Sequence, residues 1–206
     1  MLAHLDARPG IVAANVLTVP EAERLPRALR ADQLRRLFSA LASPYDLMAS
    51  WALVTGMRRK ELCALELFQV PEIAHLDADE HPLVGIGLSI TKGGYPRTVY
   101  PPIRLLDATH RYIDEVRGPL IRRLRRADPS WHAPSALFLT SRGKPVSPVR
   151  FTAAMSAAFK AAGVVGTGHW LRHCYAMTML AQLQRQARMT PCLLYTSPSP
   201  RDVEES

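Results

Sequence analysis

Two arginine-containing motifs, far apart along the chain, constrain its fold more than any other feature. The first reads TGMRRKELCAL over residues 55–65, and the second reads GHWLRHCYA over residues 168–176. A guanidinium group presents N–H donors in a planar fork that matches the oxygens of a phosphate. Both motifs therefore suit one ligand, a phosphodiester held between two arginines. This interpretation requires a fold that brings the two segments side by side.

The charge of the chain agrees with an anionic partner. The formal net charge is +8, and 22 of the 26 basic residues are arginine. A strongly basic protein attracts polyanions, partly because their counterions are released on binding. One dense run fits this reading and equally well fits a solvent-exposed helix face. This run consists of Arg122, Arg123, Arg125 and Arg126.

Length and hydrophobic content predict one domain in the cytoplasm. The chain has 206 residues and is 48% hydrophobic, which is enough to bury a core. Its longest apolar stretches fall well short of the roughly 20 residues that span a bilayer. Asp6 and Arg8 interrupt the apolar run that a signal peptide needs. The three cysteines have neither paired nor metal-ligand spacing, so we expect reduced thiols, no metal and no cofactor.

Hydrophobic periodicity predicts an α+β domain that is mainly α, with a small antiparallel sheet. Ser43 is expected to cap a helix ahead of Pro44, and Gly56 to end it. A kink or break is expected at Gly118-Pro119. Helices are predicted from residue 31 onward and at residues 44–55, 58–67, 105–126, 147–163 and 170–185. A hairpin is predicted from residues 83–90 and 97–100, with further short strands at residues 70–73 and 136–140.

The two ends of the chain are interpreted separately from this domain. Residues 1–28 contain three prolines and no sustained periodicity, so we expect a linker or the remnant of an N-terminal region. Residues 192–206 include the string CLLYTSPSPRD, which resembles the translation of a transposase adapter used in sequencing libraries. We expect this segment not to be native. The domain itself is assigned to residues 29–191 and is expected to be incomplete.

Together with the segment ITKGGYPRTVYPP, the two motifs resemble the catalytic domain of the tyrosine recombinases, also called phage-type integrases. The resemblance implies the fold of the DNA breaking-rejoining enzymes. It implies that Arg58 and Arg172 bind the scissile phosphate and that Glu61 orients the site. Arg59 is a neighbouring candidate, but the register of the motif favours Arg58.

The same resemblance assigns two proton-handling residues. Lys92, in the predicted hairpin, corresponds to the lysine that acts as general acid on the leaving 5′-oxygen. His169, three positions before Arg172, would assist by hydrogen bonding or proton transfer. His173 also fits the motif, but we interpret it as a structural histidine that packs the helix.

The implied reaction is metal-free recombination of duplex DNA. Two arginines would stabilise the pentavalent transition state, a role that divalent cations have in many nucleases. A tyrosine hydroxyl would attack phosphorus, giving a 3′-phosphotyrosyl bond and a free 5′-hydroxyl. Attack by the hydroxyl of another strand would then reseal the DNA. The implied setting is a bacterial or phage-encoded cytoplasmic protein whose intact form assembles as a synaptic tetramer on DNA, without a membrane.

The nucleophilic tyrosine of that family is not found in residues 29–191. It would lie well beyond the second arginine, where this chain has the segment we expect not to be native. Tyr195 belongs to that segment and is rejected as a nucleophile, and Tyr175 is expected to serve in packing. We therefore expect the chain to bind DNA without cleaving it.

Two other functions remain open at this point. A non-catalytic DNA-binding accessory protein could use the same fold. A metal-dependent nuclease would need clustered carboxylates, and one dense acidic group is present in a predicted hairpin loop. This group consists of Asp77, Asp79, Glu80 and His81.

Overall fold

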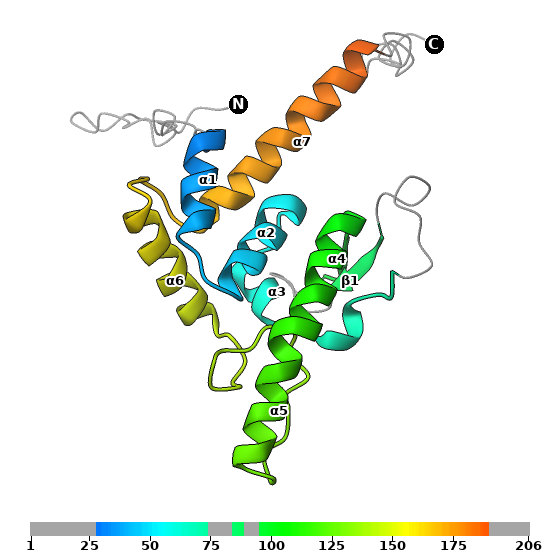
Figure 1. The fold of residues 1–206 in the computed structure, drawn as a ribbon. Coiled ribbons are helices and arrows are strands. Elements are labelled where there is room, and N and C mark those ends of the chain that lie inside the picture. The colour runs from blue at the N-terminus through cyan, green and yellow to red at the C-terminus, as the bar shows by residue number, and fades with distance from the viewer. Residues whose placement is uncertain (1–27, 74–83, 89–94, 190–206) are drawn as a thin grey trace, which may run out of the picture.

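A computed structural model describes residues 28–73, 84–88 and 95–189 of the chain, and these form a helical body with one hairpin at its edge (Figure 1). The helices are α1 (Ala31–Ser39), α2 (Tyr45–Thr55), α3 (Arg59–Cys63), α4 (Ile103–Tyr112), α5 (Gly118–Ala127), α6 (Pro148–Ala161) and α7 (His169–Met189). A 3-10 turn, η1, covers Leu67–Gln69, and a π-helical turn, η2, covers Ile113–Arg117. Strands β1 (Ile86–Leu88) and β2 (Arg97–Val99) pair antiparallel. The predicted fold class is confirmed.

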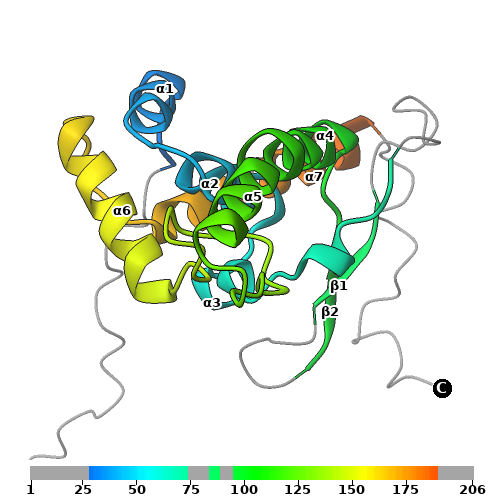
Figure 2. The same ribbon diagram turned by 60° about the horizontal axis from the view of Figure 1, so that its bottom comes forward.

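Helix α2 forms the centre of the body because most of its residues are apolar and buried. It packs against α3, α4, α6 and α7, and Figure 2 shows it between α6 on one side and α4 on the other. Met48, Ala49 and Trp51 are fully buried. The indole of Trp51 still needs an acceptor, and its Nε1–H donates to Thr109 Oγ1 of α4 at 3.0 Å.

The turn after α2 fixes where α7 lies. Gly56 ends α2, as predicted, in a left-handed conformation with φ 64°. A Cβ atom at this position would lie 2.4 Å from Cδ1 of Tyr175, so the Tyr175 ring packs directly on the glycine backbone. This confirms the packing role that we expected for Tyr175. The contact sets the first turns of α7 beside the segment that carries the first arginine motif.

The outer half of α7 extends away from the body (Figure 1). Leu171 and Cys174, in its first turns, are buried. Met177, Leu180 and Leu183, further along, are about half exposed at 49%, 49% and 58%. The helix is therefore fastened to the body at its N-terminal end.

The predicted helix starts were right in one case and wrong in another. Ser147 caps α6, because its hydroxyl accepts the Arg150 N–H at 3.2 Å. Ser43 does not cap α2, and Pro44 occupies the cap position itself. The Tyr45 N–H instead donates to the Ala42 carbonyl at 2.8 Å, so the preceding turn supplies the acceptor that the serine was expected to provide.

The predicted break near Gly118-Pro119 takes the form of the π-helical turn η2. Pro119 has no N–H, so the regular hydrogen-bond ladder cannot continue through it. The Gly118 N–H reaches back to the Ile113 carbonyl, and α5 continues beyond the proline. Arg117 of this turn is buried and donates to the carbonyls of Pro134 and Ala136 at 2.7 and 3.1 Å, which fixes the following loop.

Three predicted boundaries need correction. Helix α3 ends at Cys63 rather than near residue 67, although Leu62 and Leu65 are buried as expected. Residues 70–73 are not a strand in the described structure; the backbone pairing lies earlier, between residues 65–67 and 135–137. The strand predicted at residues 136–140 is reduced to two isolated bridges, Glu66 with Ala136 and Leu139 with Pro145.

Several sequence-based interpretations fall outside the described residues. These are the linker at residues 1–27, the acidic group at residues 77–81, Lys92 and the segment 192–206. Within the part that the structure describes, no helix combines the length and apolar character needed to cross a membrane.

Candidate phosphate-binding site

Arg58 lies at the start of α3 and is held there by Glu61. The Arg58 backbone N–H donates to Glu61 Oε2 at 2.7 Å, and its Nη1 donates to Oε1 at 3.1 Å. The Glu61 side chain is 1% exposed, whereas that of Arg58 is 39% exposed. The buried carboxylate therefore fixes both the backbone and the guanidinium of Arg58, and part of that guanidinium still faces the solvent.

A second arginine, Arg97, reaches the same carboxylate from the hairpin. Its Nη2 donates to Glu61 Oε2 at 2.5 Å, with the Arg97 side chain 33% exposed. Sequence analysis did not assign Arg97 to the site. The available signal was its place in the basic segment that also carries Lys92. The ion pair ties β2 to α3, so the hairpin is anchored beside Arg58.

The pKa of Glu61 reflects these contacts. Burial alone would raise the pKa of this carboxyl group, but the hydrogen bonds from Arg97 and from the Arg58 backbone and side chain outweigh burial. The net result is a pKa below the ordinary 4.5. Glu61 is therefore a carboxylate at neutral pH and partly offsets the two arginines.

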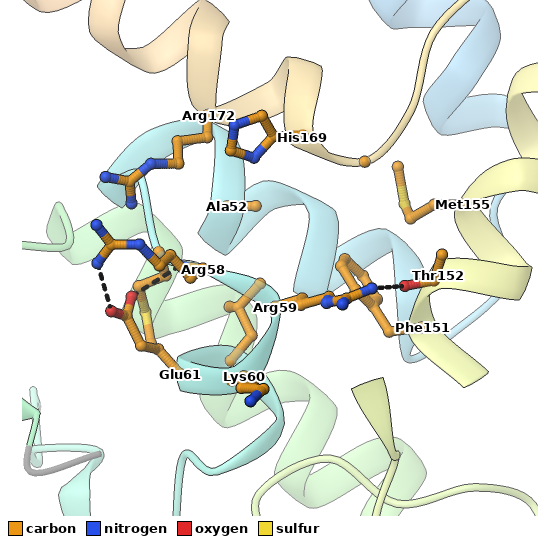
Figure 3. Close-up of a pocket in the computed structure, with 13 residues that line it drawn as sticks. Ala52, Arg58, Arg59, Lys60, Glu61, Phe151, Thr152, Met155, His169 and Arg172 are labelled. Carbon is orange, nitrogen blue, oxygen red and sulfur yellow. Dashed lines mark hydrogen bonds and ion pairs between the residues drawn. The ribbon is translucent and has the colours of Figure 1, made fainter. Parts of the chain in front are cut away.

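Arg172 enters the site from the opposite side, on the first turn of α7. Its Nη1 donates to the carbonyl of Gly56. In Figure 3, the side chains of Arg172 and Arg58 extend to the same side, from α7 and from the start of α3, and their guanidinium groups lie next to one another. Burial, followed by repulsion from Arg58 and Arg97, lowers the pKa of Arg172, while Glu61 opposes this shift. The arrangement has more cationic than anionic groups, which is what an anion-binding site requires.

His169 lies one helical turn before Arg172 and lines the same pocket. Its ring meets the ring of His173 edge to face, with centroids 4.7 Å apart. Burial, then the charges of His173, Arg172 and Arg58, lowers the pKa of His169 below its ordinary 6.5. The imidazole is therefore neutral at pH 7, where it can either accept or donate a hydrogen bond.

These side chains surround a pocket of about 720 Å³ between α2, α3, α6 and the start of α7. Four side chains along its lining carry a positive charge and one carries a negative charge. The cations are Arg58, Arg59, Lys60 and Arg172, and the carboxylate is Glu61. Arg59 points away from Arg58 toward Thr152 of α6 (Figure 3), so Arg58 is the arginine that faces Arg172, in agreement with the motif register.

Four of the five residues that sequence analysis singled out are thus brought together: Arg58, Glu61, His169 and Arg172. Their catalytic roles remain predictions. The fifth, Lys92, lies outside the described residues. Among the described residues, no group of three or more His, Cys, Asp or Glu side chains is placed to hold a metal ion.

Comparison with known proteins places the chain in a family. Residues 27–185 match the phage integrase family, and the chain belongs to it. The fold and the match together define the class as tyrosine recombinase catalytic domains. Among individual proteins, the chain is 32% identical over 177 residues to tyrosine recombinase XerC 2 of Ralstonia nicotianae (strain ATCC BAA-1114 / GMI1000). That alignment covers 81% of this chain and 46% of the relative, so the chain spans about half of the relative's length.

Solved structures agree on the fold. The lambda integrase catalytic core superposes with a TM-score of 0.54 at 18% identity, covering 75% of this chain and 84% of the core. A lambda integrase tetramer bound to a Holliday junction gives a TM-score of 0.54 at 19% identity, covering 76% and 43% of the two chains. At these identities the likeness concerns the fold alone.

Proposed function

We propose that this domain binds the phosphodiester backbone of duplex DNA between Arg58 and Arg172, and that its intact form carries out site-specific DNA recombination. The observation that carries the proposal is the convergence of two arginines from α3 and α7 on one pocket, with Glu61 as the carboxylate among its lining residues. Membership of the phage integrase family supports the same conclusion. The Holliday-junction complex of lambda integrase supports DNA and tetrameric assembly as the setting.

In this proposal the arginines stabilise the transition state of strand cleavage. Each guanidinium donates to non-bridging oxygens of the phosphate, where negative charge increases as the attacking hydroxyl approaches. Glu61 holds Arg58 in place and never touches the phosphate. His169, neutral and beside Arg172, accepts or returns a proton near phosphorus. Lys92 supplies the proton that the leaving 5′-oxygen needs.

The attacking group of the reaction is a tyrosine hydroxyl, and we propose that the present chain binds DNA without cleaving it. Tyr112 and Tyr175 both have packing roles. Tyr112 is 5% exposed, and its hydroxyl accepts the Leu139 N–H at 3.1 Å. Tyr175 is packed on Gly56. We therefore propose that neither serves as the nucleophile.

Binding to a fluorescently labelled duplex in EDTA tests the proposal. We expect Arg58→Gln and Arg172→Gln each to weaken binding by roughly 10-fold or more, because a hydrogen bond to a charged group contributes about 1.5–3 kcal/mol. Arg111→Gln is the matched control, since Arg111 is paired with Asp107 on the exposed face of α4. Equal affinities for all three variants and the unchanged chain would refute the phosphate site. Binding that is absent in EDTA and appears when excess Mg²⁺ is added would favour a metal-dependent nuclease.

Covalent trapping separates the recombinase from an accessory protein. A nicked suicide duplex captures any phosphotyrosyl adduct, because the released fragment diffuses away and religation fails. We expect no adduct with the present chain. A longer native sequence beyond α7 should form one, and that adduct should disappear in its Arg172→Gln variant. Absence of an adduct from the longer protein would instead favour a DNA-binding accessory role.

A further inference from the structure

We propose that Arg59 and Lys60, together with Thr152, form a second phosphate subsite that holds the phosphate next to the one between Arg58 and Arg172. The inference rests on the proposed function and deepens it. It assigns residues that set which phosphodiester of a strand enters the reactive position. Three features of the molecule support it: the anchoring of Arg59 to Thr152, the charges of Arg59 and Lys60 without a paired carboxylate, and the pocket shared with Arg58 and Arg172.

Arg59 is anchored across the pocket to α6. Its Nη1 donates to Thr152 Oγ1 at 3.1 Å, although the two residues are 93 positions apart. The Thr152 hydroxyl donates in turn to the Pro148 carbonyl at 2.9 Å, so its oxygen is held ready to accept from Arg59. This neutral contact fixes the direction of the guanidinium and uses one of its N–H groups. The remaining N–H groups are available to a ligand.

The charges of Arg59 and Lys60 are not balanced within the described part of the chain. Both residues are exposed, and no carboxylate there forms an ion pair with either. Glu61, the carboxylate among the pocket's lining residues, pairs with Arg58 and Arg97 instead. Two adjacent cations that line a pocket without a counter-charge favour an anionic ligand.

The geometry favours two phosphates over one shared phosphate. Arg58 and Arg59 are neighbours in sequence, so their Cα atoms are about 3.8 Å apart. Their side chains nevertheless diverge, Arg58 toward Arg172 and Arg59 toward Thr152 (Figure 3). Two guanidinium groups that point apart do not both reach the oxygens of one phosphate. They instead suit two phosphates that are adjacent along a DNA strand.

Apolar side chains of α6 lie at the Arg59 end of the pocket, beside Thr152 (Figure 3). Phe151 and Met155 of α6 line the same cavity as the four cations. A deoxyribose between two phosphates presents apolar carbon–hydrogen surface, which suits such side chains. A strand whose phosphate contacts Arg59 can therefore pack an adjacent sugar against Phe151 and Met155.

Two short oligonucleotides provide the first test. The dinucleotide dTpdT contains one phosphodiester and the trinucleotide dTpdTpdT contains two. We expect the unchanged chain to bind the trinucleotide several-fold more tightly, as measured by NMR chemical-shift titration. Arg59→Gln should remove most of that difference, because only one of the two subsites remains. A trinucleotide advantage that persists in Arg59→Gln would overturn the subsite.

Salt dependence of duplex binding provides the second test. Arg59→Gln should reduce the slope of log K against log salt concentration by roughly 0.9, the value for one lost phosphate contact. Arg59→Lys keeps the charge and should restore the slope, which a purely structural role through Thr152 would not do. Arg111→Gln again serves as the control. An unchanged slope in Arg59→Gln would contradict the subsite.

These outcomes distinguish the subsite from the proposed function itself. If Arg58→Gln and Arg172→Gln weaken duplex binding and Arg59→Gln does not, the reactive site stands and the second subsite fails. If none of the three weakens binding, the proposed function fails as well. Because Arg59 is exposed, Arg59→Gln should retain the thermal unfolding midpoint of the unchanged chain.

Discussion

At the scale of single residues, three donors converge on the carboxylate of Glu61: the Arg58 N–H, the Arg58 guanidinium and the Arg97 guanidinium. The carboxylate thereby joins α3 to the hairpin and offsets part of the charge of the site. Removing it would leave three arginines close together without a counter-ion, because Arg172 approaches from α7. Both the stability of the domain and the orientation of the Arg58 side chain depend on the Glu61 carboxylate.

We expect Glu61→Gln to lower the free energy of unfolding by about 2 kcal/mol at pH 7, because charged hydrogen bonds are lost. The folded-state pKa of Glu61 is below 4.5, so the stability that it contributes is present above pH 4.5. It is lost as the pH falls through the lower folded-state pKa. Urea unfolding at pH 7 and at acidic pH measures both effects. Parallel acid dependence in the variant and the unchanged chain would contradict this role.

His169 should report the arrival of an anion. Burial and the neighbouring cations lower the pKa of His169, so the folded state favours the neutral ring. As the pH falls below 6.5, the unfolded chain takes up this proton more readily than the folded one, and the free energy of unfolding decreases. A bound phosphate or sulfate offsets the cations and should raise the His169 pKa. NMR titration of the imidazole with and without sulfate measures the shift. In Arg172→Gln the sulfate effect should be smaller, and an equal effect would place the anion elsewhere.

At the scale of elements, the turn between α2 and α3 positions the site. Gly56 contributes a left-handed backbone conformation, a surface for Tyr175 and a carbonyl for Arg172. This one residue therefore fixes the distance between the first arginine motif and the helix that carries the second.

Gly56→Ala should destabilise the domain more than Gly163→Ala. Both glycines have φ 64°, so each substitution incurs about 1–2 kcal/mol of backbone strain. A Cβ at Gly163 would meet nothing within 4 Å, whereas one at Gly56 would meet Tyr175 at 2.4 Å. Urea unfolding of the two variants compares the costs. Equal losses would show that the Tyr175 contact adjusts freely.

Sequence patterns predicted the elements of this domain better than their ends. The apolar character of α2 and the glycine after it located the helix, and the two arginine motifs located the site. The N-cap at Ser43 was wrong because a backbone carbonyl took the place of the side chain. The role of Arg97 was missed because its partner lies 36 positions away, and its place in a basic segment did not identify that partner. Arg117 was missed for the same reason, since it bonds to carbonyls in a distant loop.

At the scale of the whole molecule, the excess of positive charge should make folding sensitive to the kind of anion in solution. The net charge is +8, and the pocket gathers four cations around one carboxylate. An anion that binds among these arginines reduces the electrostatic repulsion between them. Bound anions therefore stabilise the folded state by mass action.

We expect sulfate to raise the thermal unfolding midpoint more than chloride at equal ionic strength. At a concentration 100-fold above Kd the gain is about 2.7 kcal/mol for one site. Arg172→Gln should abolish most of the difference between the two salts, and Arg111→Gln should preserve it. Differential scanning calorimetry provides the measurement. The same sulfate increment in Arg172→Gln would indicate a general salt effect.

Helix α7 is packed on the body through its first turns, which carry Arg172, and its outer half extends beyond the body. A displacement of the outer half would act on the hydrogen bond from Arg172 to the Gly56 carbonyl. A contact made on Met177, Leu180 or Leu183, outside the pocket, would thus shift a phosphate-binding arginine without touching it.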